Sequence, residues 1–250
     1  MSATTVVTGG TKGIGLAIAR RLARHGEPLV LAYRSDEAAA DAARAELTAV
    51  GARVSTVKAD VGEIDGCARV MAAALDLGGE GPLRLVHNAA MIYPTSLLAA
   101  DLPTFTRAVQ TNGMSLLYLV RAALPQLTRG SGVVFISSAG ARTGQANYAA
   151  LGVGKALAES LIRYLVAELA PRGVRINAVA PGLVETTSVA AMVGSEEAAA
   201  RVFERAARGN PSGRLTADAD YAAMVEYLLS PAAEFVQGQV IHVNGGAYVS

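Results

Sequence analysis

Short apolar runs alternate with alanine-rich stretches along almost the entire chain, and this alternation restricts the possible folds more than any other feature. The apolar runs have the length and β-branched content of buried strands, and the alanine-rich stretches are long enough for helices. Strands are expected at 5–8, 29–33, 54–58, 83–87, 133–137, 174–179 and 239–243, with helices at 14–25, 37–50, 64–77, within 102–127, at about 147–170 and near 217–229. This series predicts an α/β fold with a doubly wound parallel sheet of about seven strands.

The length and composition fit one domain that covers residues 1–250. With 250 residues and a hydrophobic content of 52%, the chain can bury a large core, and no linker or repeat divides it. One segment, at about 186–214, does not follow the alternation. Because ligands of parallel sheets bind beyond the carboxyl ends of the strands, we interpret this segment as a helical lid over a substrate.

Composition argues against several functional classes. The apolar runs are far shorter than the roughly 20 residues that a membrane span requires, and the N-terminus leaves no room for a leader, so we expect a cytoplasmic protein with no membrane partner. The net charge of +1 argues against nucleic acid as a partner. The single cysteine, Cys67, cannot form an intrachain disulfide. His25, His87 and His242 are scattered in a way that does not resemble a metal site, and none is expected.

A glycine-rich turn joins the first expected strand to the first expected helix. Small residues at such a junction let the backbone N–H groups of the helix start approach a pyrophosphate. The turn reads Thr-Gly-Gly-Thr-Lys-Gly-Ile-Gly over residues 8–15. Its position predicts a Rossmann-type dinucleotide site, with contacts from Gly9, Thr11, Lys12, Gly13, Ile14 and Gly15.

The end of the second expected strand indicates which dinucleotide binds. Enzymes that use NAD place an acidic side chain there to bind the ribose diol. This chain instead has Tyr33 and Arg34, and Lys12 is expected to lie nearby. Because two cations suit a 2′-phosphate, we predict NADPH/NADP+ rather than NADH as the cofactor.

Motifs along the whole chain resemble the short-chain dehydrogenases/reductases. The turn follows their Thr-Gly-x-x-x-Gly-x-Gly pattern, and Ser138, Tyr148 and Lys155 resemble their catalytic residues. The resemblance implies further cofactor contacts and a helix-borne catalytic asparagine, and the positions that match are Asp60, Val61, Asn88, Ala89, Ala90, Pro181, Gly182, Val184 and Thr186 for the cofactor and Asn112 for the asparagine. Ala90 departs from the family's Asn-Ala-Gly motif. The resemblance also implies a homotetramer built through the helices at about 102–127 and 147–170.

The tyrosine is displaced from its usual place in this family. Most members carry Tyr-x-x-x-Lys, but four positions after Tyr148 the chain has Gly152, and Lys155 comes seven positions after the tyrosine. Ser138 precedes Tyr148 by ten positions, so the interval from serine to lysine keeps its usual length and the tyrosine alone has moved. The Tyr-x6-Lys spacing resembles the NADPH-dependent enoyl-acyl carrier protein reductases.

The displacement has a chemical reason that is independent of the resemblance. On a helix, three residues correspond to roughly 4.5 Å along the axis, which moves the phenol away from Lys155. A conjugated enoyl thioester accepts hydride at its β carbon while negative charge develops on the distant thioester oxygen. We therefore predict Tyr148 as the donor to that oxygen. Lys155 is expected to hold the nicotinamide ribose and to lower the pKa of the phenol. Ser138 either donates a second hydrogen bond to the substrate or simply ends the strand, and Asn112 is expected to bond helix backbone or water.

Two alternatives to a reductase of an enoyl thioester remain open. The run Gln-Ala-Asn-Tyr-Ala-Ala at 145–150 closely resembles β-ketoacyl reductases, which favours a ketoreductase of fatty-acid or polyketide-type metabolism. The displaced tyrosine also fits a non-catalytic NADP-binding sensor or scaffold. For either enzyme the substrate is an acyl thioester, free or tethered to a carrier protein. Arg142 and Arg163 are cations that such an acidic partner would approach, although a solvated surface is their default interpretation.

Overall fold

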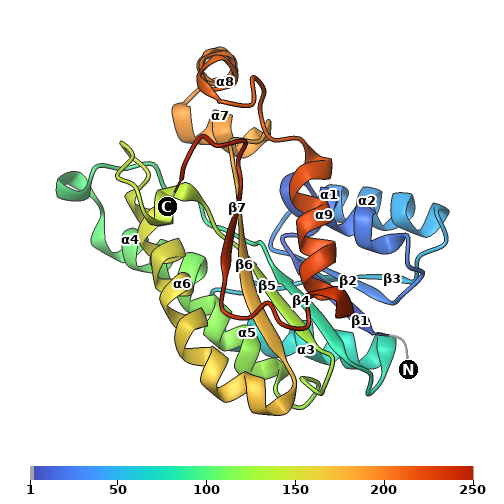
Figure 1. Ribbon diagram of the computed structural model, residues 1–250. Coiled ribbons are helices and arrows are strands. Elements are labelled where there is room, and N and C mark those ends of the chain that lie inside the picture. Colours follow the sequence, from blue (N-terminus) through green and yellow to red (C-terminus); the bar gives the residue numbers. More distant parts are fainter. Residues whose placement is uncertain (1–2, 250) are drawn as a thin grey trace.

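A single parallel sheet of seven strands forms the centre of the molecule in the computed structural model, which describes residues 3–249 (Figure 1). The strand order is β3-β2-β1-β4-β5-β6-β7. The strands are β1 (Thr4–Thr8), β2 (Leu29–Tyr33), β3 (Val54–Lys58), β4 (Leu83–His87), β5 (Gly132–Ile136), β6 (Arg175–Pro181) and β7 (Val240–Val243). The strand order reverses between β1 and β4, which confirms the predicted doubly wound α/β sheet of one domain and places a ligand-binding crevice at that point.

Helices cover both faces of the sheet (Figure 1). They are α1 (Gly13–Ala23), α2 (Glu37–Ala49), α3 (Ile64–Gly78), α4 (Leu102–Val109), α5 (Ser115–Ala123), α6 (Ala149–Leu169), α7 (Thr187–Val193), α8 (Glu196–Gly209) and α9 (Asp218–Leu229). Neighbouring strand residues point to opposite faces, so Val6 packs with α3, α5 and α6 while Val7 packs with α1 and α9. Both valines are fully buried, and each such side chain contributes about 1.5–3 kcal/mol.

The long helix expected within 102–127 is interrupted. A π-helical turn, η2 (Gln110–Met114), separates α4 from α5, and α5 ends at Ala123. Gly113 in this turn lies against α6, where a Cβ atom would come within 2.5 Å of the Gly154 carbonyl oxygen. A π turn is a single widened turn, too short to be told apart from a continuous helix in a sequence pattern, which is why the sequence predicted one helix.

The helix expected at about 147–170 begins later, at Ala149, and Tyr148 is the residue that caps it. Short 3₁₀ turns are η1 (Leu97–Ala99), η3 (Ala139–Ala141), η4 (Ala170–Arg172) and η5 (Pro231–Ala233). The segment predicted as a lid forms α7 and α8, which stand beyond the carboxyl ends of the strands (Figure 1). Within residues 3–249, none of the helices has both the length and the apolar character that crossing a membrane would take.

Candidate active site

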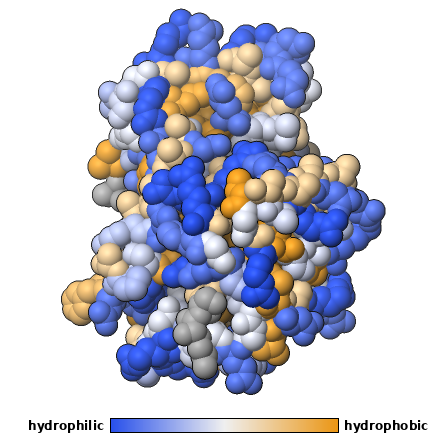
Figure 2. All heavy atoms as spheres, turned by 90° about the vertical axis from the view of Figure 1, so that its right-hand side faces the viewer, coloured by the Kyte–Doolittle hydropathy of each residue, from blue (hydrophilic) through white to orange (hydrophobic). Residues whose placement is uncertain are grey.

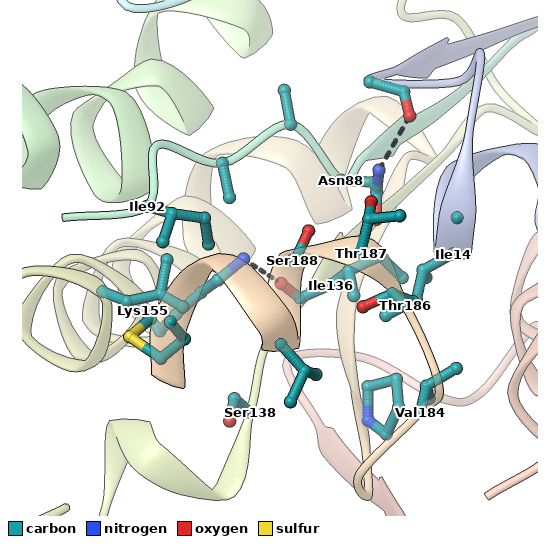
Figure 3. Close-up of a pocket in the computed structure, with 18 of the residues that line it drawn as sticks. Ile14, Asn88, Ile92, Ile136, Ser138, Lys155, Val184, Thr186, Thr187 and Ser188 are labelled. Atoms are coloured by element: carbon teal, nitrogen blue, oxygen red, sulfur yellow. Dashed lines mark hydrogen bonds between the residues drawn. The ribbon is translucent and has the colours of Figure 1, made fainter. Parts of the chain in front are cut away.

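One cavity of about 740 Å³ lies at the carboxyl ends of the strands, beneath α7 (Figure 3). It collects nearly all of the residues that the sequence predicted for a cofactor and its chemistry. The lining includes Gly9, Thr11, Lys12, Gly13, Ile14, Tyr33, Arg34, Asp60, Val61, Asn88, Ala89, Ala90, Ser138, Tyr148, Lys155, Pro181, Gly182, Val184 and Thr186. Gly15 and Asn112 are not part of this lining, and their contacts are with the backbone of residues that are part of it or adjoin it.

The glycine turn has the shape of an anion cradle. Gly9 and Gly13 have φ values of +61° and +54°, a region that favours glycine. A Cβ atom on Gly9 would lie 3.0 Å from the Cα of Ala89, and one on Gly15 would lie 2.1 Å from the Gly9 carbonyl oxygen. The side chain of Lys12, the residue that caps α1, makes no hydrogen bond to the first turn. The N–H groups of this helix start therefore remain available to a phosphate.

Asn88 joins the glycine turn to the end of β4. Its amide Nδ2 donates to the carbonyl oxygens of Thr8 (3.2 Å) and Gly9 (3.1 Å). In return, the Thr8 hydroxyl oxygen accepts from the backbone N–H groups of Asn88 and Ala89, both at 3.1 Å. These bonds lock the two loops on either side of the crevice, so the residues present fit a bound dinucleotide.

The predicted adenosine-ribose end contains an acidic residue that the sequence interpretation did not use. Arg34 lines the cavity and is exposed, as expected, but the ammonium of Lys12 pairs with Asp36 at 2.8 Å. The hydrogen bond from Lys12 holds the pKa of Asp36 below its usual value. Because both partners are exposed, the pair stabilises the fold by little. Arg34 is thus the cation at this end with no such carboxylate partner among the described residues.

Tyr148 and Ser138 lie in direct contact. Ser138 follows β5 by two residues and caps η3, where its Oγ accepts from the Gly140 N–H at 3.1 Å. The Tyr148 hydroxyl donates to the same Oγ at 3.1 Å. Ser138 therefore does more than end the strand. Its hydroxyl oxygen accepts two bonds, which leaves its own proton free to donate into the cavity.

The phenol of Tyr148 is held neutral. Burial raises its pKa above the ordinary value, and the hydrogen bond with Ser138 opposes this effect only in part. The pKa of this phenol is therefore raised overall, and the lowering expected from Lys155 is not among the effects that act on it. A neutral phenol keeps its proton and can act as a hydrogen-bond donor and acid across the physiological pH range.

The packing around Gly152 explains why no lysine stands four positions after the tyrosine. A Cβ atom on Gly152 would lie 2.5 Å from the Gly140 carbonyl oxygen and 3.5 Å from the Tyr148 ring. Gly140 is equally restricted, since its own Cβ would lie 2.4 Å from the Tyr148 ring. The ring thus rests directly on the backbone of η3, and the Gly140 carbonyl oxygen of that turn excludes a side chain at residue 152.

Lys155 supplies the positive charge of the site from α6 (Figure 3). Its Nζ donates to the Ile136 carbonyl oxygen at 2.5 Å and lies 4.6 Å from the centroid of the Phe135 ring. The side chain is only 5% exposed. Burial lowers the pKa of Lys155 to about 8, and the carboxylate of Glu159 opposes this shift. Near neutral pH, the protonation of Lys155 therefore depends on the balance between its burial and the charge of Glu159.

Asn112 acts as a brace. Its Oδ1 accepts from the Met91 N–H at 2.7 Å, and its Nδ2 donates to the carbonyl oxygens of Met91 (3.0 Å) and Ala150 (3.3 Å). The predicted bond to helix backbone is present at Ala150, but the main partner is the loop after β4. Because it lies outside the cavity lining, Asn112 holds that loop against the start of α6 and is not positioned to touch a substrate.

The apolar end of the cavity was largely missed from the sequence. Ile92, Leu151, Val189, Met192, Val193, Val202 and Tyr248 line it together with Gln145 and Ala247. Val193 and Val202 are 38% and 37% exposed, and Figure 2 shows apolar side chains gathered at the top of the molecule, where α7 and α8 lie. Only the lid residues carried a sequence signal, namely apolar side chains in the 186–214 segment. Tyr248 reaches the cavity from the C-terminal tail, a contact that no local sequence pattern indicated.

Comparisons with known proteins show oxidoreductases that are similar over nearly the whole chain. The family described as Enoyl-(Acyl carrier protein) reductase matches residues 9–248. An uncharacterized oxidoreductase of Methylorubrum extorquens is 33% identical over 243 residues, which cover 96% of each chain. The 3-oxoacyl-[acyl-carrier-protein] reductase FabG of Staphylococcus aureus is 30% identical, covering 100% of this chain and 99% of the relative.

Solved structures give the same result. A short-chain dehydrogenase/reductase of Brucella melitensis, described as a glucose/ribitol dehydrogenase, is 32% identical with a TM-score of 0.89, covering 99% of this chain and 97% of the other. A blue fluorescent protein from a metagenomic library, in complex with NADPH, is 28% identical with a TM-score of 0.87, covering 99% and 98%.

Proposed function

Because the chain belongs to the short-chain dehydrogenase/reductase family and is an oxidoreductase with a nicotinamide cofactor, we propose that it reduces a conjugated enoyl thioester with NADPH. The reaction would belong to fatty-acid or polyketide-type metabolism. Its substrate would be an acyl thioester, free or tethered to a carrier protein. The apolar end of the cavity under α7 and α8 supports an acyl group as the part of the substrate bound there.

The observation that carries this proposal is the packing of Tyr148. Its ring lies on Gly140 and its hydroxyl donates to Ser138, while the Gly140 carbonyl oxygen leaves room for glycine alone at residue 152. A lysine four positions after the tyrosine would not fit this packing, and the lysine of this chain stands seven positions after it. A donor set apart from the lysine suits a substrate in which the hydride-accepting carbon and the charged oxygen are several bonds apart.

Each residue of the site has a defined part in this mechanism. NADPH, when bound, supplies the hydride for the β carbon. The glycine turn and the start of α1 would hold its pyrophosphate, and Lys155 would hold the hydroxyls of its nicotinamide ribose. The neutral Tyr148 would turn its hydroxyl from Ser138 to the thioester oxygen and stabilise the enolate charge that develops there. The free proton of Ser138 would donate the second hydrogen bond.

Arg34 supports NADPH over NADH as the cofactor. Its guanidinium lines the cavity after β2, where a 2′-phosphate would lie, while Lys12 shares its charge with Asp36. A guanidinium binds phosphate through two parallel hydrogen bonds, which makes it the stronger of the two candidates.

We further propose that the protein acts in the cytoplasm as a homotetramer. The helices α4, α5 and α6 carry apolar side chains that remain exposed in the single chain, among them Leu102 (70%), Val153 (46%) and Tyr164 (75%). Assembly through these helices would bury such side chains between copies, and their exposure in one chain supports this proposal.

A ketoreductase is the second candidate, favoured by the 30% identity to FabG over the whole chain. A ketoreductase would need Tyr148 to protonate the oxygen on the same carbon that accepts hydride. This requirement places the phenol and Lys155 close to a single carbonyl group, whereas the spacing here separates them along the chain.

The two functions are separated by NADPH oxidation with crotonyl and acetoacetyl thioesters in parallel, for the wild type and Tyr148→Phe. We expect turnover of the crotonyl thioester and a fall in kcat of about 10²–10³-fold in the variant, the usual effect of removing one oxyanion donor. Turnover of the acetoacetyl thioester alone would establish the ketoreductase. Binding of NADPH without turnover of any enoyl or carbonyl compound would favour a sensor or scaffold.

A further inference from the structure

A buried carboxylate behind the cavity joins the two parts of the site. Glu159 lies on α6, one helical turn after Lys155, and is only 4% exposed. Its Oε1 accepts from the Ser137 hydroxyl at 2.6 Å, and its Oε2 accepts from the Nε of Arg142 at 3.0 Å. Ser137 and Arg142 are the two ends of the segment that contains Ser138 and η3.

This geometry fixes the catalytic segment to the helix that carries the lysine. Ser138 accepts a hydrogen bond from the Tyr148 hydroxyl, and Gly140 packs against the Tyr148 ring. Both residues lie between the two anchor points of Glu159. A shift of Glu159 would therefore move Ser138 and Gly140, which contact the phenol, relative to Lys155. A buried carboxylate needs such partners, because leaving it unpaired is costly.

We propose that Glu159 is a positioning residue: its carboxylate ties the Ser137–Arg142 segment to α6 and keeps the buried Lys155 ammonium charged for cofactor binding. The inference rests on the proposed role of Lys155 at the nicotinamide ribose. It does not depend on whether the substrate is an enoyl or a keto thioester.

The surroundings of Lys155 leave Glu159 as the anion that acts on it. From β4, the buried His87 is neutral because burial, aided by Lys155, lowers its pKa to about 3. From β7, burial lowers the pKa of His242, which lies near Arg142 and Glu159. Tyr148, ahead of α6, is neutral as well. The Glu159 carboxylate raises the pKa of Lys155 against the larger effect of burial.

The test measures the dissociation constant of NADPH between pH 6.5 and 9 by its fluorescence. In the wild type, we expect affinity to fall as Lys155 loses its proton near pH 8. Glu159→Gln keeps an acceptor for Ser137 but removes the charge. Its affinity should match the wild type at pH 6.5, with the fall displaced by about one pH unit to lower pH. Arg142→Ala removes the cation that partly neutralises Glu159 but keeps the Ser137 hydrogen bond, and it should displace the fall to higher pH. The two variants are expected to shift the pH of the fall in opposite directions, so either variant alone can contradict the proposal if the other fails to fold.

Controls separate this inference from its premise. Glu168→Gln removes an exposed carboxylate from the same helix and should leave the pH profile unchanged. Glu159→Asp should restore the wild-type profile in part, since it restores the charge. If Lys155→Met does not weaken NADPH binding, the proposed role of Lys155 is wrong. If Lys155→Met weakens it but Glu159→Gln leaves the pH profile where Glu168→Gln does, the proposal for Glu159 is overturned.

Discussion

His87 should make the stability of this protein sensitive to mild acid. The side chain is fully buried at the end of β4. The Ser115 hydroxyl donates to the Thr111 carbonyl oxygen at 2.6 Å, so its oxygen accepts from His87 Nε2 at 2.6 Å. The proton then sits on Nε2, and Nδ1 accepts from the Thr8 hydroxyl at 2.8 Å. The imidazole is therefore fully bonded in its neutral form.

The size of the effect follows from its pKa. Burial, and secondarily the charge of Lys155, lowers the pKa of His87 from 6.5 to about 3. Between these values the unfolded chain binds a proton that the folded chain does not bind. Stability from this group is complete above pH 6.5 and is lost as pH falls toward 3. At about 1.4 kcal/mol per unit, roughly 2 kcal/mol is lost between pH 6.5 and pH 5.

The assay is urea unfolding at pH 7.5, 6.5 and 5 for the wild type and His87→Gln, at one protein concentration because the chain is proposed to be a tetramer. The glutamine variant is expected to be less stable at pH 7.5, since it loses packing and hydrogen bonds. Its further loss between pH 6.5 and pH 5 should be smaller than that of the wild type by roughly 2 kcal/mol. Equal losses in the two proteins would refute the neutral, buried histidine.

Three further predictions concern the site and the core. Gly140→Ala places a Cβ atom 2.4 Å from the Tyr148 ring and should lower kcat by roughly 10²-fold, whereas Gly144→Ala, with open space around it, should not; equal kcat values in steady-state assays would contradict the packing. Arg34→Ala should weaken NADPH binding by roughly tenfold to a hundredfold and leave NADH binding unchanged in titrations, and equal weakening of both would show that no 2′-phosphate is bound there. Burial raises the pKa of Cys67 to about 12, so alkylation of the folded protein at pH 8 should be far slower than in urea, and rapid labelling would contradict its burial.

Local sequence patterns predicted the sheet because its strands are buried on both faces. The runs at 29–33 and 83–87 coincide with β2 and β4, since short runs rich in Leu and Val that follow Gly and Pro leave few alternatives. The π turn at Gln110–Met114 was not predicted because it is a single turn within a longer helical stretch. The start of α6 was misplaced by two residues, a difference within the usual fraying of helix ends.

In the site, too, features within a short stretch of sequence were predicted, and contacts between separate stretches were not. The spacing of Ser138, Tyr148 and Lys155 is written in the chain, and the structure brings Ser138 and Tyr148 into contact. The net rise in the pKa of the phenol was not predicted, because a sequence identifies a charged neighbour but does not give the extent of burial. Glu159 was not identified because its contacts are with a separate segment, at Ser137 and Arg142. Tyr248 was not identified because it lines the cavity with residues far from it in the sequence.

The most direct test of the proposed function is a competition in one reaction. The wild-type enzyme receives an equal mixture of crotonyl and acetoacetyl thioesters of the same carrier with limiting NADPH, and the products are measured by mass spectrometry. A displaced Tyr148 that serves conjugate reduction predicts butyryl thioester in large excess. A predominance of 3-hydroxybutyryl thioester would contradict this function and show that the phenol protonates the oxygen of the carbon that receives the hydride.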